Sequence, residues 1–173
     1  MRNISVALSV VAVCAALPAL ADDFGILARK AGQWKIEMVP ETAKAAPAMT
    51  FHLCLDAESD KALMSAGAGM AAGARCTMSK PAQGPDGLAF DGACDMGAMK
   101  TKSHTVISGD FQSSYTLKIT SDTTGGPAAM PKHSVMTQNA TYEGACASDM
   151  EPGDMMMPGA MKVNALKAMK PGG

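Results

Sequence analysis

The chain has 173 residues and a formal net charge of −1 at pH 7, with 15 basic and 16 acidic side chains. This near-neutral balance argues against nucleic acid as a partner, because proteins that bind it carry a clearly basic surface. Hydrophobic residues make up 47% of the chain but aromatic residues only 4%, and 16 residues are methionine. Methionine and leucine must therefore fill much of the core.

Residues 1–21 are predicted to be a secretory signal peptide. Arg2 gives the positively charged start, residues 4–16 form an apolar run too short to span a bilayer, and residues 19–21 (Ala-Leu-Ala) match a cleavage site. Cleavage there predicts a periplasmic mature chain with no later membrane span. A lipoprotein anchored at Cys14 is the disfavoured alternative, because the residue before it is a valine, where a smaller residue is expected.

Most of the mature chain alternates apolar and polar residues, the period of a strand with one buried face. The predicted strands cover residues 32–38, 49–55, 75–80, 87–94, 99–108, 115–120 and 130–142. Turn-forming sequences such as GPDG at 84–87 and TGGP at 124–127 separate them. Connections this short favour antiparallel hairpins that follow one another along the chain.

One helix is predicted among the strands, over residues 56–64. Asp56 is a suitable N-cap, and further acidic residues in the first turn suit the positive end of the helix dipole. The Gly/Ala-rich residues 66–74 and the proline-containing residues 40–48 are predicted to be flexible connections. From residue 148 the composition changes to Met, Pro and Gly, which predicts a flexible tail over residues 148–173.

Four cysteines remain after signal cleavage, namely Cys54, Cys76, Cys94 and Cys146. An even number in an exported chain predicts two disulfides, and the absence of CxxC or zinc-like spacing argues against cysteine chemistry. Spacing alone does not choose among the three pairings. We favour Cys54–Cys76, which closes a moderate loop over the glycine-rich stretch, and Cys94–Cys146, which ties the middle of the domain to its end.

Together these patterns predict one mainly β domain over residues 22–147. Its expected form is a single antiparallel β-meander, a curled sheet or partial barrel of about seven strands, with one short helix and two disulfides.

Several short motifs in this order resemble one bacterial family. They are Gly32-x-Trp34, then Cys54-Leu55 before the helix, then Cys76, Cys94 and a closing Gly144-Ala-Cys146. Over residues 30–147 the chain is similar in these motifs to the exported family catalogued as domain of unknown function 3617 (DUF3617). The resemblance implies a periplasmic or otherwise exported β-rich domain and implies no reaction. The Gly-x-Trp opening also resembles the first strand of lipocalin-type barrels, whose interior can take an apolar ligand.

No motif for catalysis is visible. The three histidines, His52, His104 and His133, are not accompanied by a Gly-x-Ser-x-Gly, HExxH or phosphate-loop pattern. We therefore expect no catalytic residues, no bound cofactor and no enzyme activity.

Methionine thioethers are soft ligands that suit Cu(I) or Ag(I). The stretch 154-DMMMPGAMK-162 gathers several of them, and another pair lies three residues apart earlier in the chain. The candidate metal ligands are Met96, Met99, Met155, Met156, Met157 and Met161. The favoured interpretation is nevertheless that methionine serves as an adaptable apolar filler.

The favoured function is non-catalytic binding in the cell envelope by a monomeric domain, with a small apolar ligand or an envelope protein as partner. A Cu(I)- or Ag(I)-binding protein is the first alternative and an enzyme the second. An apolar cavity would favour the ligand, and converging Met or His side chains would favour the metal. A base beside a nucleophile in a polar cleft would favour the enzyme.

Overall fold

The computed structural model describes residues 28–41, 47–69 and 75–168, and the signal peptide expected at 1–21 lies outside these ranges. One ten-stranded sheet has the order β10-β9-β2-β1-β8-β7-β6-β5-β3, with β4 paired to β5. The strands are β1 (Gly32–Pro40), β2 (Met49–Leu55), β3 (Arg75–Met78), β4 (Ala82–Gly84), β5 (Gly87–Asp95), β6 (Met99–Gly109), β7 (Ser114–Gly125), β8 (His133–Gly144), β9 (Asp154–Met157) and β10 (Met161–Asn164). The helices are α1 (Ala57–Gly69) and α2 (Ala165–Ala168).

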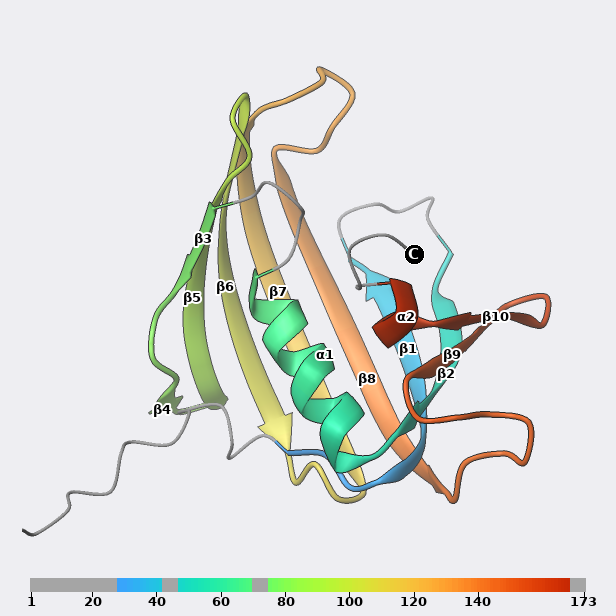
Figure 1. The fold of residues 1–173 in the computed structure, drawn as a ribbon. Coiled ribbons are helices and arrows are strands. Elements are labelled where there is room, and N and C mark those ends of the chain that lie inside the picture. The colour runs from blue at the N-terminus through green and yellow to red at the C-terminus, as the bar shows by residue number, and fades with distance from the viewer. Residues whose placement is uncertain (1–27, 42–46, 70–74, 169–173) are drawn as a thin grey trace, which may run out of the picture.

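The sheet is curved and open, with β3 and β10 at its two ends (Figure 1). Each strand pair is antiparallel, and β5 to β8 follow one another as a meander. The predicted antiparallel curled sheet is confirmed, but the sheet has ten strands rather than about seven. The additional strands β4, β9 and β10 are only three or four residues long. Strands this short give too few alternations to be recognised from sequence.

Strand β1 illustrates how alternation builds the core. Trp34 and Ile36 are buried on one face, whereas Lys35 between them is exposed. The core on that face consists of Trp34, Ile36, Phe51, Leu53, Leu55, Tyr115 and Ala140. The indole Nε1 of Trp34 donates a hydrogen bond of 2.8 Å to the carbonyl of Lys30, so burying this side chain leaves no polar atom without a partner.

Helix α1 lies across the face of the sheet that carries the core (Figure 1), and its Leu63 packs against the core cluster. Asp56 caps it as predicted, because its Oδ1 accepts a 2.7 Å hydrogen bond from the backbone N–H of Ser59. The helix continues to Gly69, so the predicted loop at 66–74 is wrong for its first four residues, and residues 70–74 lie outside the described part. Neither helix formed by the described residues is long and apolar enough to cross a membrane.

Residues 154–164, expected in a flexible tail, instead extend the sheet by two strands, and the short helix α2 follows them. Strand β9 pairs with β2, and β10 pairs with β9. Asp154 is buried and joins the two added strands, accepting hydrogen bonds from Asn164 Nδ2 at 2.8 Å and from the N–H of Glu151 at 2.9 Å. These residues form strands because β2 would otherwise expose unpaired backbone N–H and C=O groups at its edge, and β9 pairs with that edge.

The disulfide pairing differs from the one favoured above. Cys76 and Cys94 lie directly opposite each other on β3 and β5, with Cα atoms 4.1 Å apart. Cys54 on β2 forms its disulfide with Cys146, which follows β8. Strand β1 lies between β2 and β8, and its Gln33 pairs with Cys54 on one side and with Gly144 on the other. The expected Cys54–Cys76 bond is excluded by topology, because β2 and β3 lie toward opposite ends of the sheet.

Candidate functional site

A cavity of about 230 Å³ lies between α1 and the core face of the sheet. Its apolar walls are formed by Leu63 and Met64 of α1 and by Phe51, Leu53, Ile107 and Leu117 of the sheet, among others. Three polar side chains also reach it, those of Arg29, Tyr115 and Gln138. An apolar hollow with a few convergent polar groups is the usual composition of a small-molecule site.

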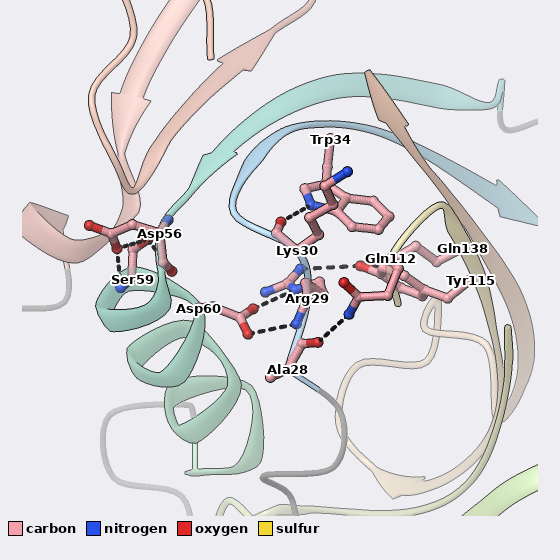
Figure 2. Close-up of polar contacts among 10 residues, drawn as sticks. All are labelled: Ala28, Arg29, Lys30, Trp34, Asp56, Ser59, Asp60, Gln112, Tyr115 and Gln138. Atoms are coloured by element: carbon pink, nitrogen blue, oxygen red, sulfur yellow. Dashed lines mark hydrogen bonds and ion pairs between the residues drawn. The ribbon is translucent and has the colours of Figure 1, made fainter. Parts of the chain in front are cut away.

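Arg29 is held in the wall of this cavity by Asp60 of α1. Its Nε donates to Asp60 Oδ1 at 2.6 Å, and its backbone N–H donates to Oδ2 at 3.0 Å (Figure 2). The two side chains are only 8% and 5% exposed. Burial alone would lower the pKa of Arg29, but Tyr115 and Asp60 together raise it above its ordinary value, so the guanidinium is charged. The pair thus fixes α1 to the segment that leads into β1.

Tyr115 links this ion pair to the opposite wall. Its Oη accepts a hydrogen bond from Arg29 Nη1 at 3.1 Å and a longer one from Gln138 Nε2 at 3.4 Å. Its ring stacks on Phe111 with centroids 5.0 Å apart and lies 5.4 Å from the Trp34 ring. The polar end of the cavity is therefore a connected set of side chains from β7, β8, α1 and the segment before β1.

Phe111 reaches the cavity from a tight turn between β6 and β7. Its φ of 56° is in the left-handed region, which is uncommon for a large side chain. The turn is held by Asp110, whose carboxylate accepts hydrogen bonds from the backbone N–H groups of Ser113, Gln112 and Ser114. These bonds, above all those from Ser113, hold the pKa of Asp110 well below its ordinary value. The aromatic wall is thus supported by a rigid turn.

A larger hollow of about 480 Å³ lies over β3, β5, β6 and β7. Its charged side chains are mostly solvent-exposed, with His104 54% and Asp91 72% exposed. Exposed side chains are not fixed by packing, so they do not form a preorganised site. We therefore regard the smaller cavity under α1 as the better candidate.

The three histidines lie apart, and each pairs with a carboxylate of another strand, which is the adjacent strand for His104 and His133 and lies beyond β1 for His52. The Nδ1 atoms of His52, His104 and His133 lie 2.8–2.9 Å from Glu143, Asp91 and Asp122 respectively. Among the described residues no serine, threonine or cysteine side chain hydrogen-bonds to an imidazole. No group of three or more His, Cys, Asp or Glu in the described part of the chain is arranged to hold a metal ion.

Comparison with known proteins places this sequence in a family. Residues 29–146, more than half of the chain, match the model described as "Protein of unknown function (DUF3617)". The chain belongs to the DUF3617 family. No curated protein and no solved structure matches it. The match contains the Gly-x-Trp opening and all four disulfide cysteines, so the resemblance expected from those motifs is confirmed.

The DUF3617 match includes most of the cavity but ends before β9, whose Met155 completes one wall. Alternation along β9 separates the methionines. Met155 and Met157 pack against the core cluster. Met156 lies between them, so its side chain is on the other face of the sheet, and it pairs with His52 of β2. Met161 pairs with Met157 and is 58% exposed. The stretch therefore does not turn its thioethers toward one point.

The remaining pair, Met96 and Met99, flanks the turn between β5 and β6 and is linked by a backbone hydrogen bond of 2.9 Å. In the strand order, β5 and β6 lie near the β3 end of the sheet, whereas β9 lies near the β10 end. The candidate ligands are thus divided among separate places. Soft-metal binding stays a prediction, which a Cu(I) titration against a chromophoric chelator can test.

Sequence reasoning did not single out Arg29, Asp60 or Tyr115 as site residues. Gln138 offered the one local signal, because it occupies an inward position in the alternation Met136-x-Gln138-x-Ala140, where an apolar residue is expected. A polar residue at a core position is a candidate for function.

Proposed function

We propose that this DUF3617 protein is a non-catalytic binding protein of the cell envelope. Its ligand is a small, mainly apolar molecule held in the cavity between α1 and the sheet. The observation that carries the proposal is the cavity itself, with apolar walls and a connected group of three polar side chains.

The cavity volume limits the ligand. At about 230 Å³ it is smaller than the roughly 300–1,000 Å³ of pockets that hold drug-sized molecules. The ligand is therefore either small or extends beyond the cavity at one end. Burial of its apolar surface would supply most of the binding free energy.

The cellular location rests on the expected signal peptide and is supported by the two disulfides, which persist in oxidising compartments. Mass spectrometry of the protein isolated from the periplasmic fraction should find Asp22 as its first residue. Recovery of the chain in the cytoplasm with residues 1–21 attached would contradict this part of the proposal.

The binding itself is tested by an NMR chemical-shift titration of the mature, oxidised protein with octane. We expect shifts concentrated at the cavity walls. The variant Leu63→Phe places a larger side chain in the cavity and should abolish them, whereas Val163→Phe, at an exposed position on β10, should leave them unchanged. Equal binding by the Leu63→Phe variant would refute the proposal, as would absence of binding by octane and by oxygenated probes of similar size.

A further inference from the structure

The polar end of the cavity carries information about the ligand's chemistry. We infer that the ligand bears an uncharged oxygen acceptor, such as an ester, ketone or ether oxygen, which binds between Tyr115 and Arg29. This inference rests on the proposed function and narrows its ligand to neutral oxygenated molecules, excluding fatty-acid anions.

The first argument is the supply of hydrogen-bond donors. Tyr115 Oη already accepts from Arg29 and Gln138, and no described residue accepts its own O–H. The Arg29 guanidinium has five N–H donors, and no described residue accepts from its Nη2. Tyr115 is only 5% exposed, so water has little access to it. Two neighbouring side chains of the cavity wall thus offer N–H and O–H donors that no described residue accepts, and a ligand oxygen can accept them.

The second argument is charge. Arg29 is the one charged side chain among the described cavity walls, and the Asp60 carboxylate already neutralises it at 2.6 Å. A carboxylate ligand would place a second anion beside Asp60 in a site of low dielectric constant, which is unfavourable. A neutral acceptor takes the same hydrogen bonds without adding a charge. The ion pair therefore selects against anions although an arginine is present.

The third argument is position. Figure 2 shows Arg29 between Asp60 on α1 and Tyr115 on the sheet, so these polar groups lie together. Leu63, Ile107 and Leu117 are apolar residues that line the same cavity. The ligand would place its oxygen at Tyr115 and its hydrocarbon part along these walls.

The test compares three probes by NMR titration of the mature, oxidised protein. They are octane, methyl hexanoate and heptanoate, and the last two have the same heavy-atom composition. We expect methyl hexanoate to bind at least about tenfold more tightly than either of the others, the size of effect that one buried hydrogen bond to a charged network gives.

Variants assign the preference to the named atoms. Tyr115→Phe removes the hydroxyl and keeps the ring, so it should reduce the ester's advantage over octane while octane still binds. Tyr142→Phe is the matched control, because the Tyr142 hydroxyl donates to the Ala31 carbonyl outside the cavity. Asp60→Asn, if it folds, removes the neutralising charge and should improve heptanoate binding relative to the ester.

The outcomes separate the two proposals. If none of the probes binds, the proposed function fails. If octane binds as tightly as methyl hexanoate, or if Tyr115→Phe retains the ester preference, the cavity binds ligands but the inference is wrong. Tightest binding by heptanoate to the unaltered protein would likewise overturn it.

Discussion

Individual residues show how polar groups are accommodated in this small core. Arg29 and Asp60 are charged and almost fully buried, which is tolerated only because each satisfies the other. Tyr115 continues the network to Gln138 on the far wall. Removing one partner of such a pair leaves an uncompensated charge, so we expect these positions to affect stability as well as binding.

Asp110 leads to a prediction about acid stability. Its carboxylate accepts three backbone hydrogen bonds and one from the Ser113 hydroxyl, so its pKa in the folded protein lies below the ordinary 3.8. A carboxyl with a lowered folded pKa stabilises the fold above its unfolded pKa, and this contribution is lost as the pH falls toward the folded value. The free energy of unfolding should therefore decrease below about pH 4.

The measurement is urea unfolding from neutral pH to about pH 2. Asp110→Asn should be less stable than the unaltered protein at neutral pH, and the difference should shrink in acid as Asp110 becomes protonated in the unfolded chain. Asp86→Asn, at an exposed position between β4 and β5, is the control and should follow the unaltered protein. A difference that is constant with pH would show that Asp110 acts by shape and not by charge.

At the scale of elements, β9 decides how the methionine-rich stretch is used. Its four residues alternate between the core face and the opposite face, so consecutive methionines have different environments. We expect Met155→Ala to lower the free energy of unfolding by roughly 1–3 kcal/mol and Met156→Ala by about 0.5 kcal/mol or less. Urea unfolding of both variants measures the difference. Equal losses would mean that β9 does not hold this register against β2.

At the scale of the whole molecule, the segment beyond the family match completes the sheet and one wall of the cavity. A chain that ends after Ala147 keeps all four cysteines but loses β9, β10 and α2. It should unfold at lower urea concentration and bind the apolar probe more weakly, because the β2 edge and the place of Met155 are then open to water.

The control for this truncation is a chain that ends after Ala168, which keeps both strands and α2 and should behave as the full-length protein. If the chain ending after Ala147 is as stable as the control and binds equally well, the added strands contribute nothing to the domain.

The amino-acid sequence by itself determined the features that depend on local patterns. The alternation in residues 32–38 and 49–55 predicted β1 and β2, and Asp56 predicted the start of α1, because side-chain periodicity and capping involve only neighbouring residues. The Gly-x-Trp and cysteine motifs pointed to the DUF3617 family for the same reason.

Only the tertiary structure decided the rest, because it depends on which distant segments become neighbours. The disulfide partners follow from strand order, which brings Cys54 to Cys146 across 92 positions of sequence. Strands β9 and β10 form against an edge that exists only after β2 has joined the sheet. The cavity likewise needs Arg29, Asp60 and Tyr115 to meet, and no local pattern links residues separated by 31 and 86 positions.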